Sequence, residues 1–350
     1  MAFIANEGVA PKGERYDRSA LVTDTVNKLY KKTEIGDFIY SSNNLETGSI
    51  GLNKYGKACI SPVYSIFEPT GKADSDFLGR RLVRKDFINA MVKWRQGVIY
   101  GQWRIHESDF LKIEIPVPSV EEQRKIGDYL DCLDRLITLH QRKYDKLTKV
   151  KKAMLEKMFP KNGRLYPEIR FKGFTDAWEQ RKFSDIAETR RGLTYKPNSI
   201  VDNGVRVLRS SNINEDTFVF GNDDVFVDEN AVNIPYIQNG DILITSANGS
   251  SRLVGKHAII RNLPDNSAVH GGFMLIASSS NPEFLNASMS SQWYSEFVSL
   301  YVAGGNGAIG NLNKNDLDTQ IVLVPSVAEQ QQIGSYFRNL DNLITLHQRM

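Results

Sequence analysis

The feature that most constrains the fold of this chain is an internal repeat. Residues 118–142 return as residues 325–349, with 17 of 25 positions identical at a constant offset of 207. A weaker echo at an offset of 204 relates Gly36-Asp37, Ser42, Asn44 and Gly51 to Gly240-Asp241, Ser246, Asn248 and Gly255. This period is far longer than that of solenoid or propeller repeats. The sequence therefore predicts two similar globular units, each followed by a helix, with pseudo-twofold symmetry.

Composition excludes several classes of protein. The 350 residues are 41% hydrophobic and 24% charged, which is ordinary for a globular protein, and the net charge of +3 does not by itself identify a nucleic-acid binder. Cys59 and Cys132 form neither a disulfide framework nor a zinc motif, and we expect both to be buried. The chain contains no apolar run long enough for a membrane span and no signal-peptide pattern, so we expect a cytoplasmic protein without membrane contact.

The pattern of residues favours an α+β fold with five segments. Short strand-like runs separated by Gly, Asn and Pro fill both globular units, as in GDFIYSS, KACISPVYSIF and LKIEIPV of the first and VRVLRS, DILITS, KHAIIR and GGFMLIAS of the second. We predict a first unit at 1–117, a helix at 118–160, a connector at 161–177, a second unit at 178–324 and a short helix at 325–350.

Both copies of the repeat carry the signals of an amphipathic helix. Ser119 precedes Glu122 by three residues, as Ser326 precedes Glu329, which is a capping-box pattern. Apolar residues then follow at alternating steps of four and three, which is typical of a coiled-coil seam. The predicted contacts between the helices, or with a partner, are Ile126, Leu130, Leu133, Ile137 and His140 in the first copy and Ile333, Phe337, Leu340, Ile344 and His347 in the second. We expect the two helices to pack antiparallel.

The helix and the connector together resemble a known family. The pattern VPSxxEQxxIxxxLxxLDxLIxLHQR, followed by KKAMLEKMFPKNG and PEIRFKGFTDAWEQRK, is similar to the conserved regions of type I restriction-modification specificity subunits. The resemblance implies two target recognition domains that each read half of a split DNA site. It also implies that the helices joining them form a spacer and bind methyltransferase subunits. Each recognition domain would meet the major groove, with half-sites about one helical turn apart and an asymmetric site.

The two copies differ at their ends. Met1 aligns with Val205, and Met350 aligns with Lys143, so the first unit lacks counterparts of 178–204 and the last helix lacks the segment KYDKLTKVKKAMLEKMFP. The expectation is a first recognition domain without its start. The alternative function is therefore that of a truncated or recombination-reservoir fragment, which binds partner subunits without reading a complete site.

The sequence lacks the signatures of catalysis. Asn281-Pro282-Glu283-Phe284 departs from the methyltransferase motif and is interpreted as a turn into a helix, and the segment from Gly305 to Gly310 lacks the Lys-Ser/Thr of a phosphate-binding loop. No Glu-x-Lys triplet or HExxH motif is present, so we predict neither catalytic nor metal-binding residues. The resemblance implies that S-adenosylmethionine, ATP and Mg²⁺ belong to the methyltransferase and restriction subunits.

Glycine-containing segments rich in Arg, Lys, Asn and Gln are the candidate DNA contacts, because these side chains match base edges and phosphates. In the second unit the candidates are Arg190, Arg191, Thr194, Tyr195, Lys196, Arg209, Ser210, Asn212, Ser246, Asn248, Arg252, Lys256, Asn306, Asn313 and Lys314. In the first unit they are Ser42, Asn43, Asn44, Lys54, Gln102 and Arg104. For any single residue, an ordinary surface turn is the simpler interpretation. The basic run at 143–164 could face DNA or an acidic partner, although a solvated helix face is favoured.

Overall fold

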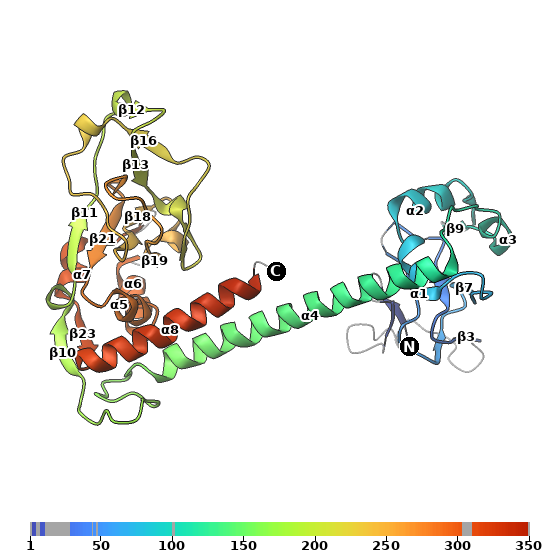
Figure 1. The fold of residues 1–350 in the computed structure, drawn as a ribbon, viewed down its shortest axis with the longest axis horizontal. Helices are drawn as coiled ribbons and strands as arrows, with labels where there is room; N and C mark the ends of the chain where they lie inside the picture. Colours follow the sequence, from blue (N-terminus) through green and yellow to red (C-terminus); the bar gives the residue numbers. More distant parts are fainter. Residues whose placement is uncertain are drawn as a thin grey trace. The chain divides into compact units, whose positions relative to one another are not determined.

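The computed structural model describes residues 2–4, 8–10, 29–43, 45–46, 48–99, 102–302 and 310–348. It contains two compact units, residues 1–138 and residues 139–350. Figure 1 shows that both units combine short strands with helices, in agreement with the predicted α+β class. The boundary between the units falls inside one long helix, α4 (Val120–Lys157), rather than at a loop. Within the described ranges, no helix is both long enough and apolar enough to span a membrane.

The first unit is built on small antiparallel sheets. The central one has the order β5-β4-β7, and the other pairs are β1-β2, β3-β6 and β8-β9. Phe38, Tyr40, Phe67 and Phe110 stack in its core, with centroid distances of 4.4–5.9 Å. The strands are β1 (Ala2–Ile4), β2 (Gly8–Ala10), β3 (Lys31–Thr33), β4 (Phe38–Tyr40), β5 (Ile50–Leu52), β6 (Ala58–Ile60), β7 (Ser65–Phe67), β8 (Gln96–Ile99) and β9 (Gln102–Arg104), and the helices before α4 are α1 (Ser75–Arg81), α2 (Lys85–Val92) and α3 (Glu107–Phe110).

The second unit has two four-stranded sheets, with the orders β11-β21-β17-β19 and β12-β16-β13-β20. Its strands are β10 (Glu179–Lys182), β11 (Glu188–Arg191), β12 (Ile200–Val201), β13 (Val205–Leu208), β14 (Ile213–Asn214), β15 (Thr217–Phe218), β16 (Val225–Val227), β17 (Ile242–Thr245), β18 (Ala247–Asn248), β19 (His257–Ile259), β20 (Ala268–His270), β21 (Met274–Ser278), β22 (Gly310–Asn311) and β23 (Ile321–Val324). Its helices are α5 (Pro282–Met289), α6 (Gln292–Val302), α7 (Lys314–Thr319) and α8 (Val327–Gln348).

The central strand β17 is buried on both faces, which explains its uninterrupted apolar sequence. Ile242 and Ile244 pack with the cluster that includes α5 and α8, whereas Leu243 packs with the opposite cluster around Ile276. All four residues of β17 are buried.

The internal repeat predicted from the sequence is present in the local structure of both units. Glu34 N donates to Asp37 Oδ2 at 2.7 Å, and Gln238 N donates to Asp241 Oδ2 at 3.0 Å, so the same side chain closes the same turn. The glycine before each aspartate has a positive φ, +91° and +97°, a conformation that glycine adopts without strain. β4 and β17 follow these turns as the central strands of equivalent sheets.

In each unit, a glutamine near the start of the repeated helix, α4 or α8, also contacts the residue that precedes another helix. Gln123 Nε2 donates to Pro118 O at 2.8 Å while its Oε1 accepts from Asp74 N. Its counterpart Gln330 donates to Pro325 O at 3.0 Å and accepts from the side chain of Asn281. The predicted N-cap contacts are confirmed, because Ser119 Oγ accepts from Glu122 N at 3.3 Å and Ser326 Oγ accepts from Glu329 N at 3.4 Å.

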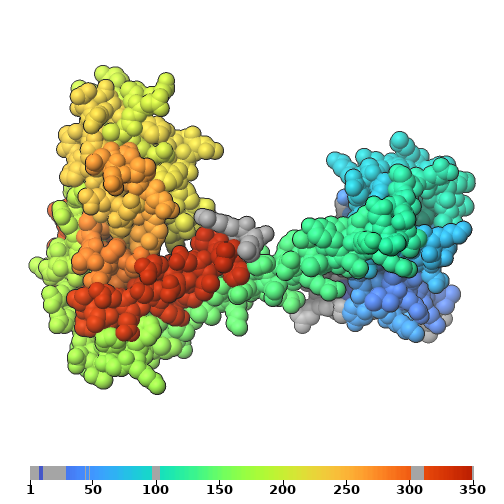
Figure 2. All heavy atoms as spheres, viewed as in Figure 1, coloured from blue at the N-terminus to red at the C-terminus, as the bar shows by residue number. Residues whose placement is uncertain are grey.

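Within the second unit, α8 packs antiparallel against the C-terminal half of α4, as predicted (Figures 1 and 2). His140 contacts His347 through the two Nδ1 atoms at 2.8 Å, Lys151 Nζ lies 2.8 Å from Asp341 Oδ1, and Phe159 packs on Phe337. Residue numbers therefore rise along α4 as they fall along α8. The two histidines, which are equivalent in the repeat, contact each other directly.

The apolar neighbours of α8 differ from those predicted. Ile333, Phe337 and Leu340 are buried in one cluster with Leu147, Val150, Met154 and Leu155 of the second half of α4 and with Met158 and Phe159, which follow α4 directly. Ile126, Leu130, Leu133 and Ile137 belong to the first unit, where the side chains of Leu133 and Ile137 are 37% and 61% exposed. An antiparallel register that brings residue 140 to residue 347 explains this, because it directs Ile333 and Phe337 toward the end of α4.

Two smaller predictions are wrong. Cys59 and Cys132 are both exposed rather than buried. The segment 111–117, LKIEIPV, forms no strand, although its counterpart β23 pairs with β10. A strand requires a hydrogen-bonding partner, and no described segment of the first unit pairs with residues 114–117.

Candidate nucleic-acid interface

The predicted recognition segments of the second unit meet at one end of its central sheet. β11 ends at Arg191 and β17 ends at Thr245, and both run antiparallel to β21, so both end beside the start of β21. Asn248 Nδ2 donates to Ser210 Oγ at 2.9 Å, which joins the segment after β17 to the segment after β13. β22 pairs with β18 and brings residues 310–314 to the same end. Segments far apart in the sequence therefore form one surface.

Two backbones cross closely beneath this surface. Leu193 N donates to His270 O at 2.7 Å, and Gly271 N donates to Leu208 O at 2.9 Å. A Cβ atom on Gly192 would lie 2.0 Å from Gly271 O, which is far inside van der Waals contact. Only glycine fits at position 192, so the crossing fixes the segments after β11 and before β21 relative to each other.

Several predicted contact residues are available at this surface. Arg191, Thr194, Lys196, Arg252 and Asn313 are exposed. Arg191 donates to Asn313 Oδ1 at 3.3 Å, a weak contact that leaves most of its donors free. Together they supply guanidinium, ammonium, hydroxyl and amide groups, which is the set that phosphates and base edges accept.

Other predicted residues are held by the protein itself. Asn212 is fully buried and donates to Val219 O and Asp224 Oδ1, at 3.1 and 2.7 Å. Arg190 is bound to Asp241 and to Ser278 Oγ at 3.0 and 3.2 Å. Arg209 donates to Asp223 O at 2.6 Å. These three residues support the shape of the segments that carry the exposed side chains.

The remaining candidates of the second unit lie between these extremes. Ser246 is 7% exposed, Ser210, Asn248 and Lys256 are half-buried, and Tyr195 is packed against the cluster around Val207. Lys314 Nζ lies 2.5 Å from Asp318 Oδ2. Asn306 lies outside the described residues.

The first unit places its candidates at two ends of its sheet. Ser42 follows β4 and its Oγ accepts from Ile105 N at 3.0 Å, which joins it to the exposed Arg104 at the end of β9. Asn43 lies beside Ser42, and its Oδ1 is buried with no hydrogen-bond partner among the described residues. Lys54 lies at the opposite end, beyond β5, where it is bound to Asp131 and Asp76 at 3.2 and 3.4 Å.

Two candidates of the first unit are not described at the level of side chains. Asn44 lies outside the described residues, and only the backbone of Gln102 in β9 is described.

His270 lies beneath the interface in its neutral form. Burial lowers the pKa of His270 to about 4, against a weaker opposing effect of its 3.2 Å hydrogen bond to Arg190 O. Because the ring is 1% exposed and Gly271 follows it directly, its protonation would place a charge under the backbone crossing.

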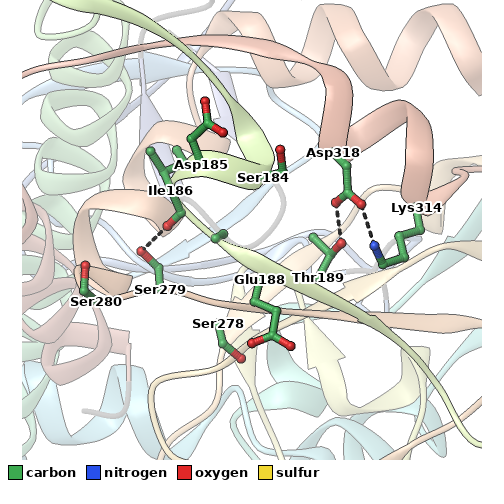
Figure 3. A pocket seen from close by; sticks show the side chains of 11 residues that line it. Ser184, Asp185, Ile186, Glu188, Thr189, Ser278, Ser279, Ser280, Lys314 and Asp318 are labelled. Carbon is green, nitrogen blue, oxygen red and sulfur yellow. Dashed lines mark hydrogen bonds and ion pairs between the residues drawn. The ribbon is translucent and has the colours of Figure 1, made fainter.

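A polar hollow of about 520 Å³ lies at the opposite end of β21 (Figure 3). Asp318 stands between Thr189 Oγ1 and Lys314 Nζ, and Ser279 Oγ donates to Ile186 O at 2.8 Å. Its lysine is thus already paired with a carboxylate. No group of three or more His, Cys, Asp or Glu side chains in the described ranges could hold a metal ion.

Sequence reasoning missed the turn between β20 and β21. Phe273 is 72% exposed there, and its carbonyl oxygen accepts from Ser246 N and Ala247 N at 2.9 and 3.1 Å. The sequence GGF before a strand is a signal for a turn. Phe273 nevertheless belongs to a strand-like run, where an apolar residue is more often buried, so its exposure was not predicted.

Comparisons with known proteins agree with this architecture. Residues 10–149 and 175–350 match the family model of the type I restriction modification DNA specificity domain. The type I restriction enzyme MjaVIII specificity subunit of Methanocaldococcus jannaschii is 23% identical over 95% of this chain and 80% of its own length. The EcoKI specificity subunit of Escherichia coli is 27% identical over 65% of this chain, which spans about half (51%) of that relative.

A solved structure shares the fold. The S subunit of a type I restriction-modification system from M. genitalium aligns with 91% of this chain and 80% of its own, at 14% identity and a TM-score of 0.56. The chain therefore belongs to the type I restriction-modification DNA specificity family. Within a type I system it is a specificity subunit, the component that recognises DNA and is not itself an enzyme.

Proposed function

We propose that the chain recognises an asymmetric, bipartite site on double-stranded DNA, with one half-site read by each unit. Exposed Arg191, Thr194, Lys196, Arg252 and Asn313 would contact one half-site, and the segments around Ser42 and Arg104 would contact the other. Because the two surfaces carry different side chains, the two half-sites would differ in sequence.

The observation that carries this proposal is that Ser42 and Arg104 of the first unit, but not Lys54, lie at the end of the sheet that is equivalent to the end where the predicted segments of the second unit meet. β4 and β17 have the same place in their sheets, and Ser42 and Ser246 each lie four residues after the first residue of these strands. Two similar reading surfaces in one chain are what a split target requires. A chain with one such surface would be expected to read a single uninterrupted DNA site.

The proposal extends to partner subunits. Tyr129, Leu133, Leu136 and Ile137 are exposed apolar residues of α4, with exposed fractions of 37–66%. An apolar stripe on an exposed helix is suited to docking other helices, and we assign it to methyltransferase subunits, with restriction subunits joining that complex. S-adenosylmethionine, ATP and Mg²⁺ would be bound by these partners in the cytoplasm, and this chain would carry no cofactor.

A selection experiment tests the proposal. The full chain, purified with its methyltransferase partner, is incubated with a library of random duplexes, and the bound fraction is sequenced. We expect two short motifs separated by a constant number of unspecified base pairs. A single motif, read by the second unit alone, would support the alternative of a fragment that recognises an incomplete site. Binding without sequence preference would exclude the proposal.

A further inference from the structure

The exposed turn before β21 has an equivalent in the first unit. Met274 N donates to Gly271 O at 2.8 Å, which closes a four-residue turn with Phe273 at its third position. In the first unit, Tyr64 N donates to Ser61 O at 3.3 Å and places Val63 at the third position of a turn that leads into β7.

Strand register shows that the two turns correspond. Phe67 of β7 pairs with Phe38 at the start of β4, and Ala277 of β21 pairs with Ile242 at the start of β17. The shift from 67 to 277 is 210 residues, which is also the shift from 63 to 273. Val63 and Phe273 therefore occupy the same structural position in the two units, although this offset differs from the 207 of the helices.

Both positions hold an exposed apolar side chain. Phe273 is 72% exposed and Val63 is 60% exposed. Leaving such a side chain in water forgoes its burial and gives the folded chain no benefit, whereas a polar residue would suit the same turn. Single exposed apolar residues are common on protein surfaces, but here one recurs at the same position of both units, where it is available to a molecule outside the unit.

The surroundings of Phe273 indicate what covers it. A Cβ atom on Gly272 would lie 3.2 Å from Thr194 Oγ1, and one on Gly271 would lie 3.9 Å from Cγ of Arg209. Phe273 O accepts from Ser246 N and Ala247 N, so the turn is held firmly among the predicted recognition segments. An exposed apolar side chain on a turn held beside the segments that carry Thr194 and Arg209 is suited to the edge of a base pair in the major groove.

Resting on the proposed function, we infer that Phe273, and Val63 in the other unit, contact the C5-methyl group of a thymine in their half-sites. This methyl group is the apolar feature that the major groove presents. Valine has no ring to insert between bases, so contact with a methyl group is the chemistry that both residues share.

The test deletes that methyl group from the DNA. The full chain with its methyltransferase partner is bound to duplexes of the selected site in which each thymine in turn is replaced by uracil. Burial of a methyl group contributes enough free energy that its loss should weaken binding about fourfold at one thymine in each half-site. Phe273→Ser should weaken binding of the thymine duplex and abolish the uracil effect in one half-site only. Val63→Ser should do the same in the other.

Ile321→Ser is the matched control, because Ile321 is 48% exposed on β23 and should change neither effect. Unchanged thermal unfolding of the Phe273→Ser variant shows that the fold is kept. The inference is overturned if the uracil effect persists in Phe273→Ser, if no thymine shows it, or if the half-sites contain no A·T pair. Each of these results leaves sequence-specific binding intact, whereas loss of all sequence preference in the unmodified chain rejects the proposed function itself.

Discussion

A side chain can contact a base or a phosphate only if the protein does not already use its donors. In the second unit this separates Arg252, which is exposed and makes no ion pair in the described part of the chain, from Arg206. Arg206 is bound to Asp224 and lies over the rings of Phe220 and Phe226, at 4.8 and 4.9 Å. The same residue type thus has a structural role at position 206, whereas at position 252 its donors are free for the proposed contact with DNA.

Replacement of Arg252 tests the binding role. Arg252→Ala should weaken DNA binding and lower the slope of log K against log salt concentration by about 0.9, the value for loss of one phosphate contact. Titrations at several salt concentrations measure the slope. Lys182→Ala, an exposed lysine on β10, is the control, and equal slopes for the two variants would contradict the assignment.

Replacement of Asp224 tests the structural role. Its side chain is 1% exposed and accepts from Asn212 Nδ2 at 2.7 Å and from Gly221 N at 3.1 Å. Asp224→Ala leaves these donors and Arg206 unpaired, so the free energy of unfolding should fall by about 3 kcal/mol. Urea unfolding measures the change. Asp223→Ala is the matched control, because its side chain is 76% exposed. An Asp224→Ala variant as stable as the unchanged chain would refute the structural role.

Residue types predicted the segments of the candidate interface but not the structural role of each residue. Arg190, Arg191 and Arg209 are alike in sequence, yet Arg190 and Arg209 are bound to acidic residues distant in the sequence. Only the fold brings Asp241 to Arg190 or Asp223 to Arg209. Phe273 was not among the predicted contacts. The apolar run that contains it predicts a strand but does not show that Phe273 lies in the turn before that strand.

At the scale of elements, α4 and α8 were the most predictable parts of the molecule, because capping residues and apolar spacing are local signals. Which residues of α4 meet α8 was not predictable, since the register depends on contacts such as that between His140 and His347. The connector adds another fixed point, because Arg170 binds both carboxylate oxygens of Glu329, at 2.8 and 2.7 Å.

Loss of the contact between Arg170 and Glu329 should destabilise the second unit. Glu329 is 1% exposed, so Arg170→Ala leaves a buried carboxylate without its counterion and should lower the free energy of unfolding by about 3 kcal/mol. Arg164→Ala, an exposed arginine in the same connector, should leave it unchanged. Chemical denaturation of both variants provides the comparison, and a similar loss in both would contradict a specific role for Arg170.

The histidine pair predicts a dependence of stability on pH. Burial, together with the nearby charges of Lys143 and His140, lowers the pKa of His347. A group whose pKa is lower in the folded state binds more protons when unfolded, so its contribution is complete above about pH 6.5 and is lost as pH falls. His347→Gln should therefore flatten the decline in melting temperature between pH 7 and pH 5.

A control separates this effect from that of the other histidines. Leu346→Gln, at an exposed position of α8, should keep the slope of the unchanged chain, which also contains the contributions of the buried His257 and His270. Melting temperatures at a series of pH values measure both variants. Identical slopes for His347→Gln and the unchanged chain would show that His347 does not contribute to the pH dependence in this range.

At the scale of the whole molecule, the proposed pair of reading surfaces predicts cooperation between the two half-sites. A duplex that contains one half-site should bind much more weakly than the full site, because the second contact becomes intramolecular once the first is made. Adding one base pair between the half-sites should also weaken binding, since it rotates and displaces one target relative to the other. Competition titrations compare the three duplexes, and equal affinity for all would contradict a bipartite site.

The crossing of Gly192 over the carbonyl oxygen of Gly271 has a consequence for redesign of the target sequence. A Cβ atom there would approach to 2.0 Å, so no other amino acid can replace this glycine without moving the backbone. Residues at the tips of the neighbouring loops can be substituted, whereas a loop graft that alters the crossing would displace the tips of all these loops together. New specificities should therefore be sought by substituting outward-facing positions and retaining this glycine as an invariant pivot.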